Sequence, residues 1–242
     1  MQFSVHEHAA DLGAAAADLA VEAIQAALAG GGRAQVLLAA APSQLPVLTE
    51  LARRGLDHSR IDYFHMDDYV GLPTDSPRGF GNWLVSEYFD KIDGSPVDSF
   101  HRLPVGPSGE EMAACYAAGL PQGAFDLVLC GIGMNAHIAF NDPGCDFWDA
   151  QDVRVVELAV DSRLQQVREG LFATLEDVPT QAVTITVPRL MRARRVICSV
   201  LGEVKRAALA EVLDREPTNQ VPATVLKLHP DAYLLADAEA RG

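Results

Sequence analysis

Basic residues are scarce in this 242-residue chain, which has 19 Lys and Arg against 33 Asp and Glu and a formal net charge of −14. Nucleic acids and anionic membrane surfaces are bound through basic patches, so we expect neither as a partner. An acidic protein that binds an anion must concentrate positive charge locally. Each Lys or Arg near a candidate site is therefore informative.

Cysteine is also rare, and none of the four cysteines forms a Cys-x-x-Cys pair or has zinc-like spacing with a histidine. We therefore expect reduced thiols, a cytoplasmic location and no metal site. His6 and His8 have strand spacing, but no ligand set is arranged around them, so we expect no metal there either. The start of the chain lacks the apolar core of a signal peptide, and we expect no run long enough to cross a bilayer.

Aromatic residues make up only 7% of the chain, so Ala, Leu and Val must fill most of the core. Apolar runs of strand length alternate with segments of helical periodicity, which predicts crossover connections and a largely parallel sheet. We expect an α/β fold with a single doubly wound, mostly parallel, Rossmann-like sheet, helices on both faces, and one domain over residues 1–242. The expected strands are residues 35–41, 61–66, 125–131, 154–158, 195–201 and 232–236, the last closing the sheet, and the expected helices are 9–29, 43–54, 82–92, 110–120, 162–172 and 205–213.

The segment Cys-Gly-Ile-Gly-Met-Asn-Ala-His-Ile-Ala-Phe-Asn-Asp-Pro, residues 130–143, directly follows the strand-like run 125–129. Loops at the carboxyl ends of parallel strands are where ligands bind in open α/β sheets. Gly131 and Gly133 let the backbone approach a ligand closely. His137 can titrate near neutrality, and a nearby carboxylate can orient it. The segment is therefore a candidate acid–base site.

A second segment of the same form is Phe-His-Met-Asp-Asp-Tyr-Val-Gly-Leu-Pro, residues 64–73, in which the strand-like run 61–66 leads into Asp67 and Asp68. Two adjacent carboxylates, Asp67 and Asp68, repel each other, and one of them titrates high if it is desolvated. The alternative is a simple turn or helix cap, because Asp is a common capping residue.

Taken together, the two segments resemble the two signatures of the glucosamine-6-phosphate deaminases, which form one superfamily with the 6-phosphogluconolactonases and ribose-5-phosphate isomerases. The resemblance runs from about residue 30 to about residue 237. The lactonase branch usually reads Asp-Gly-His-Thr-Ala-Ser after the glycines. Residues 136–142 read Ala-His-Ile-Ala-Phe-Asn-Asp instead, which resembles the deaminase side.

The resemblance implies that glucosamine 6-phosphate and water are converted to fructose 6-phosphate and ammonia, by acid–base chemistry without a cofactor. It implies that Asp67 is the enolising base and that His137 assists opening of the sugar ring. Asp142 stands where the family carries Glu and would orient His137, and Asn135 stands where some deaminases have Asp. We expect Asp67 and His137 to lie across one pocket, at the carboxyl ends of neighbouring strands.

Phosphate-binding residues are also implied by the resemblance. Ser43 follows the first expected strand and opens a helix, although Ala41 and Pro42 leave fewer free backbone N–H groups there. Lys205 opens a later helix at the position of the family's phosphate-binding Lys. Arg168 matches the phosphate-binding Arg best, and Arg163 is its rival. Without the family, Ser43 reads as an N-cap and both arginines read as surface charges.

Departures from the family pattern keep other functions open. Ala136 replaces a Gly found in most relatives, and Asp142 is one methylene shorter than the usual Glu, which places its carboxylate about 1 Å short. The alternatives are a sugar-phosphate lactonase, a deaminase or isomerase for another amino sugar phosphate, and a non-catalytic sugar-phosphate sensor. The pattern is compatible with a homo-oligomer. Gly131-x-Gly133 is no dinucleotide fingerprint, because the third glycine and the following acidic residue are absent.

Overall fold

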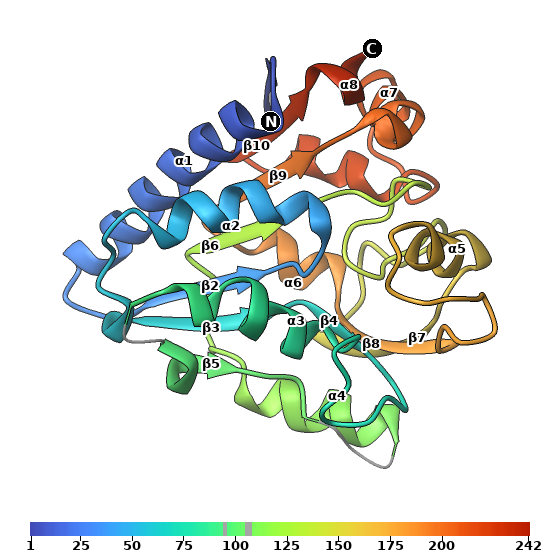
Figure 1. The fold of residues 1–242 in the computed structure, drawn as a ribbon, viewed down its shortest axis with the longest axis horizontal. Helices are drawn as coiled ribbons and strands as arrows, with labels where there is room; N and C mark the ends of the chain where they lie inside the picture. The colour runs from blue at the N-terminus through green and yellow to red at the C-terminus, as the bar shows by residue number, and fades with distance from the viewer. Residues whose placement is uncertain (94–95, 105–107) are drawn as a thin grey trace.

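The central sheet consists of seven strands, all of which run parallel. The computed structural model describes residues 1–93, 96–104 and 108–242. In spatial order the strands are β1 (Gln2–His6), β10 (Ala232–Asp237), β9 (Arg195–Val200), β6 (Leu127–Cys130), β2 (Ala34–Leu38), β3 (Ile61–His65) and β5 (Phe100–His101) (Figure 1).

The strand order reverses between β2 and β6. From β2 the chain moves to β3 and β5 on one side, and from β6 it moves to β9 and β10 on the other. Loops that leave a sheet on either side of such a reversal diverge and open a crevice at the carboxyl ends of the strands. The polar segments singled out in the sequence follow β3 and β6, so both emerge at this crevice.

Helices cover both faces of the sheet, as the alternating pattern predicts. Side chains alternate between the faces along each strand, so that Leu37 and Val128 enter one core while Val36 and Leu129 enter the other. The helices are α1 (Ala9–Ala29), α2 (Leu45–Ala52) and α3 (Phe80–Glu87) over the second of these cores, α4 (Gly109–Gly119), α6 (Val187–Met191) and α7 (Arg206–Asp214) over the first, and α5 (Val160–Arg168) and α8 (Ala238–Arg241) at the ends of strands.

A second, three-stranded antiparallel sheet stands at the carboxyl edge of the central one, and the sequence analysis missed it. Its strands lie in the order β4 (Asp67–Tyr69), β8 (Gln181–Ile185) and β7 (Val153–Glu157). The strand expected at 154–158 exists, but it belongs to this small sheet. The main prediction, a mostly parallel central sheet with helices around it, is confirmed.

The edge of the central sheet also differs from the expectation. Residues 232–236 were expected to close the sheet, but β10 lies between β9 and β1, and β1 is the outer strand. β1 was missed because most of its side chains are exposed, so its sequence carries little of the apolar signal that marks buried strands.

Helix α1 is long and apolar enough, by length and composition alone, to cross a membrane, contrary to the expectation from the sequence. Its residues Leu12, Ala16, Ala20 and Ile24 are fully buried against the sheet and α2. Burial of one face in this way is the usual arrangement of a core helix in an α/β protein.

Candidate active site

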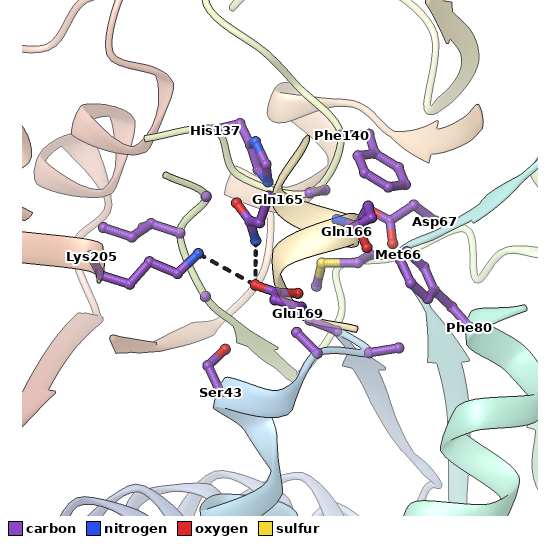
Figure 2. A pocket seen from close by; sticks show the side chains of 17 residues that line it. Ser43, Met66, Asp67, Phe80, His137, Phe140, Gln165, Gln166, Glu169 and Lys205 are labelled. Carbon is purple, nitrogen blue, oxygen red and sulfur yellow. Dashed lines mark hydrogen bonds and ion pairs between the residues drawn. The ribbon is translucent and has the colours of Figure 1, made fainter. Parts of the chain in front are cut away.

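A pocket that is open to solvent lies at the carboxyl ends of β2, β3, β6 and β9. Figure 2 shows Asp67 and His137 projecting into it from different segments, with Lys205 and Ser43 on the side away from Asp67. Asp67 and His137 therefore share one pocket, as expected. Their strands are not neighbours, however, because β2 lies between β3 and β6.

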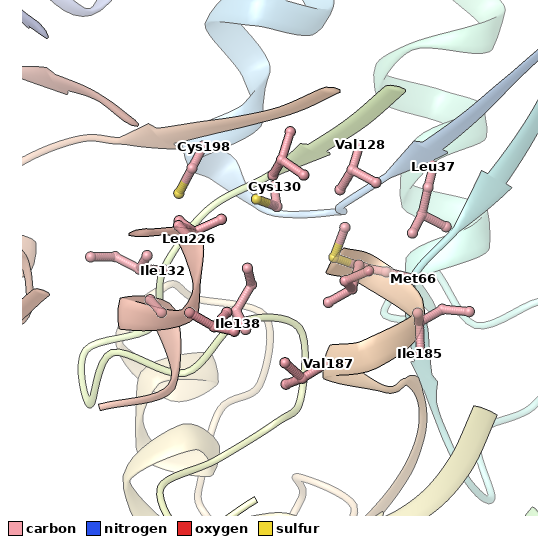
Figure 3. Packing of buried hydrophobic residues seen from close by; sticks show 14 of the residues in the cluster. Leu37, Met66, Val128, Cys130, Ile132, Ile138, Ile185, Val187, Cys198 and Leu226 are labelled. Carbon is pink, nitrogen blue, oxygen red and sulfur yellow. The ribbon is translucent and has the colours of Figure 1, made fainter. Parts of the chain in front are cut away.

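The loop after β6 is anchored from below by Ile132 and Ile138, which are 5% and 1% exposed and pack into the core with Cys198 and Leu226 (Figure 3). Ala136, within this loop, has φ +60°. That is the left-handed region, which disfavours a residue with a Cβ. Ala136, which stands where most relatives have Gly, is therefore strained.

The two glycines of the loop are needed for space. A Cβ on Gly133 would lie 2.1–2.4 Å from ring atoms of His137, so the ring packs directly on the backbone. A Cβ on Gly131 would lie 3.1 Å from Ser43 Oγ and 3.2 Å from the Ser199 carbonyl oxygen. Gly131 thus lets the Ser43 hydroxyl approach the base of the loop, and both glycines line the pocket.

His137 is held by a buried polar network. Its Nδ1 lies 2.9 Å from Ser162 Oγ and 3.3 Å from Asp142 Oδ1, and the Ser162 hydroxyl also bonds Asp142 Oδ1. Asn135 does not line the pocket. Its Nδ2 donates to Asp142 Oδ1 at 2.9 Å and its Oδ1 accepts the His137 backbone N–H at 3.2 Å.

The network fixes which nitrogen of His137 carries the proton. Asp142 is partly buried, which alone would raise its pKa, but hydrogen bonds from His137, Ser162 and Asn135 hold that pKa well below its usual range. Asp142 is therefore an ionised acceptor, and its other oxygen accepts the Ala159 backbone N–H at 2.9 Å. In the neutral imidazole, these acceptors place the proton on Nδ1, so that Nε2 is the nitrogen that can accept a proton.

Asp67 is almost completely buried, with 6% of its surface exposed. Burial, together with the charge of Asp68, raises the pKa of Asp67 to about 8, although the Phe140 backbone N–H opposes the shift. Asp68 is a cap: its carboxylate accepts the backbone N–H groups of Tyr69, Phe80 and Gly81 at 2.8–3.1 Å. The two adjacent carboxylates thus have separate tasks.

Lys205 supplies the positive charge of the pocket and is 5% exposed. It lies in the 3₁₀ turn η5 (Glu203–Lys205) after β9, and Ser43 lies in the 3₁₀ turn η1 (Pro42–Gln44) after β2. Both line the pocket. Within the described residues, no three His, Cys, Asp or Glu side chains gather in a way that would hold a metal ion.

Neither predicted arginine lines the pocket. The Arg163 guanidinium donates to the backbone carbonyls of Leu175 and Val178 at 2.6 and 2.9 Å, so it links α5 to the segment that follows it. Arg168 is exposed, and its Nη1 lies 3.6 Å from the sulfur of Met134.

Helix α5 contributes polar residues that the sequence analysis missed. Ser162, Gln165, Gln166 and Glu169 recur at positions i, i+3, i+4 and i+7, which places them on one face of the helix. That face is turned to the pocket, and Ser162, Gln165 and Gln166 are 1–6% exposed. The spacing itself was the available signal, because a polar stripe with helical periodicity is as directional as an apolar one.

Comparison with known proteins identifies relatives over almost the whole chain. The family model for glucosamine-6-phosphate isomerases and 6-phosphogluconolactonase matches residues 7–234. The glucosamine-6-phosphate deaminase of Pseudarthrobacter chlorophenolicus is 36% identical over 228 residues, which cover 92% of this chain and 86% of the relative. That of Shouchella clausii is 36% identical over 197 residues, covering 80% and 77%.

Solved structures agree with the fold. A monomeric glucosamine-6-phosphate deaminase superposes with a TM-score of 0.90 at 26% identity, covering 99% of this chain and 98% of the other. The 6-phosphogluconolactonase of Trypanosoma brucei superposes with a TM-score of 0.78 at 21% identity, covering 99% and 97%. The second likeness concerns the fold alone.

The raised pKa of Asp67 predicts an effect on stability. A carboxyl whose pKa rises from its ordinary value of 3.8 to about 8 on folding binds its proton more tightly in the folded state than in the unfolded state. Protonation of Asp67 therefore stabilises the fold, and this contribution is complete at acid pH. That contribution is lost as the pH rises from about 4 to about 8. Asp67→Asn, which stays neutral, should therefore have a higher free energy of unfolding than the wild type, by more than about 1 kcal/mol at pH 8. The difference should vanish near pH 4.

Urea denaturation between pH 4 and pH 9 measures this difference. Asp75→Asn is the control, because Asp75 is exposed in the connection that follows β4. A difference between Asp67→Asn and wild type that does not change with pH would show that Asp67 ionises normally in the folded protein.

Proposed function

The chain belongs to the family of glucosamine-6-phosphate isomerases and 6-phosphogluconolactonases, and we propose that it is a glucosamine-6-phosphate deaminase. The reaction converts glucosamine 6-phosphate and water to fructose 6-phosphate and ammonia. The observation that carries the proposal is that Asp67, a buried carboxylate with a raised pKa, shares one pocket with His137, whose Nε2 is left free as a base. Binding alone would need neither group.

His137 opens the sugar ring in this proposal. Its free Nε2 accepts the proton of the C1 hydroxyl, and the imidazolium then gives a proton to the ring oxygen as the C1–O5 bond breaks. The ionised Asp142 and the Ser162 hydroxyl stabilise the positive charge that His137 carries between the two steps.

Asp67 moves the proton between the two adjacent carbons. It removes the C2 proton from the open-chain sugar while the C1 carbonyl oxygen takes a proton from the C2 ammonium group, which gives an enolamine. Asp67 then returns its proton to C1, which leaves an iminium at C2, and water adds to that iminium and expels ammonia to give the C2 ketone. A pKa of about 8 suits a group that must both accept and donate a proton near neutrality. The ammonium group at C2 of the bound substrate lies beside the abstracted proton and favours the ionised carboxylate.

Lys205 and the Ser43 hydroxyl are assigned to the phosphate. Both line the side of the pocket away from Asp67 (Figure 2), as a 6-phosphate remote from C1 and C2 requires. Arg163 is excluded from this role by its bonds to backbone carbonyls. Arg168 stays a candidate as an exposed side chain at the end of α5, beside the loop that carries His137.

Release of ammonia from glucosamine 6-phosphate, followed with a coupled glutamate dehydrogenase assay, tests the proposal. Galactosamine 6-phosphate tests for another amino sugar. Hydrolysis of 6-phosphogluconolactone without ammonia release would favour the lactonase, and binding without turnover of any of these would favour a sensor. The four free cysteines fit the proposed cytoplasmic location.

The proposed base predicts the outcome of Asp67→Asn. The amide is nearly isosteric but cannot accept the C2 proton, so kcat should fall on the order of 100-fold or more while sugar-phosphate binding persists. Steady-state kinetics and calorimetric binding measure the two quantities. Near-normal kcat would contradict the enolisation role, and the lactonase would then gain support.

Removal of the Ser162 hydroxyl should lower kcat less than Asp67→Asn does, because Ser162 acts through His137. Ser162→Ala should lower kcat roughly tenfold with little change in KM, since the His137 ring loses the hydroxyl that links it to Asp142. Ser162→Thr keeps the hydroxyl and should restore most of the activity. Equal losses in both variants would indicate a packing effect instead.

Lys205→Ala should raise KM for the phosphorylated sugar about ten- to a hundredfold, with a much smaller change in kcat. A charge-assisted contact to phosphate contributes roughly 1.5–3 kcal/mol, and the phosphate is remote from the reacting carbons. Lys91→Ala, which removes an exposed lysine paired with Glu87, is the control variant. Unphosphorylated glucosamine is the control substrate and should be insensitive to Lys205→Ala. An unchanged KM would place the phosphate elsewhere.

A further inference from the structure

Glu169 is a carboxylate inside the pocket that the proposed reaction does not use. Its Oε1 lies 3.8 Å from Lys205 Nζ, and Figure 2 shows it between Lys205 on one side and Asp67 on the other. A negative charge beside the lysine assigned to the phosphate works against binding of a dianion.

The position of Glu169 is fixed by a chain of hydrogen bonds. The Met134 backbone N–H donates to Gln165 Oε1 at 2.9 Å, which leaves the Gln165 amide N–H groups facing Glu169. Gln165 Nε2 then donates to Glu169 Oε1 at 2.7 Å. Gln165 is only 6% exposed, so this amide has few alternatives. The carboxylate is thus held toward Lys205 from the loop that carries His137.

Burial of Lys205 explains why a carboxylate is held there. A lysine with about 5% of its surface exposed is costly without a counterion. Glu169 provides that counterion, and its side chain is 21% exposed, which leaves it a way toward solvent. It directly follows α5 and precedes Gly170, so it is the last residue of the helical turn that faces the pocket.

We propose that Glu169 competes with the substrate's phosphate for Lys205, so that a phosphorylated sugar binds by exchange with this carboxylate. This inference rests on the assignment of Lys205 to the phosphate in the proposed function. In the empty pocket Glu169 neutralises Lys205. When a phosphate dianion takes its place, like-charge repulsion drives the Glu169 side chain outward. Glu169 therefore weakens the binding of every phosphorylated ligand and favours release of the phosphorylated product.

The exchange predicts the effect of Glu169→Gln on the binding of inorganic phosphate, measured by calorimetry at constant pH and ionic strength. The variant should bind phosphate at least about tenfold more tightly than the wild type, because the competing charge is gone. Its melting temperature without phosphate should fall, since Lys205 loses its counterion, and phosphate should raise that temperature by more than it does in the wild type. Glu169→Ala should behave in the same way.

Two further variants locate the effect. Glu203→Gln removes a carboxylate two residues from Lys205 that is 76% exposed and paired with Arg206, and it should change phosphate affinity less than twofold. In Glu169→Gln/Lys205→Ala the gain should disappear, because Glu169 acts through Lys205. Phosphate affinity in Glu169→Gln equal to or weaker than that of the wild type would overturn the exchange. Persistence of the gain without Lys205 would do so as well.

Kinetics with the phosphorylated sugar separate this inference from the proposed function. In an active deaminase, Glu169→Gln should lower KM while leaving kcat within a few-fold of the wild type. Tighter phosphate binding without ammonia release from any amino sugar would leave the exchange intact and refute the deaminase. Ammonia release by the wild type, with unchanged phosphate affinity in Glu169→Gln, would refute the exchange alone.

Discussion

The absence of a side chain at Gly133 is the constraint on which the site depends. The His137 ring occupies the volume that a Cβ on Gly133 would fill. In that position Nδ1 reaches Ser162 and Asp142. Ser162 belongs to α5, so the same close approach also docks the helix that brings Gln165 and Glu169 to the pocket. A single backbone position thus couples the acid–base group to the anion side of the pocket.

Most of the central sheet could be predicted from sequence because buried parallel strands are continuous apolar runs between helices of clear periodicity. The small sheet could not be predicted for the opposite reason. β4 has only three residues and begins with two carboxylates, and its pairing partner β8 lies more than a hundred residues away in the chain. Its stability comes from pairing and packing, which a local pattern does not reveal. The edge strand β1 escaped detection because it has no buried side chain and therefore carries little apolar signal.

The candidate site shows the same difference between residues that a local sequence pattern reveals and residues that only packing brings together. Asp67 and His137 could be found because each lies in a polar segment that follows a strand, and the carboxyl ends of parallel strands meet at one edge. Ser43 and Lys205 were implied by the family resemblance. The residues of α5 reach the pocket through packing between elements. Positive charge alone was a poor guide, because Arg163 and Arg168 were predicted to bind phosphate but do not line the pocket, whereas Gln165, Gln166 and Glu169 do. Asp142, shorter than the family's Glu, has the Ser162 hydroxyl between itself and the imidazole, and this contact could not be inferred from the loop sequence.

The two groups that transfer protons, Asp67 and His137, belong to different sheets of the fold. Asp67 is the first residue of β4 and pairs with Thr184 in the small sheet, whereas His137 belongs to a loop of the central sheet. The small sheet and the loop that carries His137 are joined by two hydrogen bonds. The Phe140 backbone N–H donates to Thr184 Oγ1, and the Asn141 side-chain amide donates to the Ile185 carbonyl. The spacing between base and imidazole is therefore a property of how the two sheets are seated. Substitutions in the packing beneath the small sheet would therefore shift Asp67 relative to His137 without altering a single lining residue.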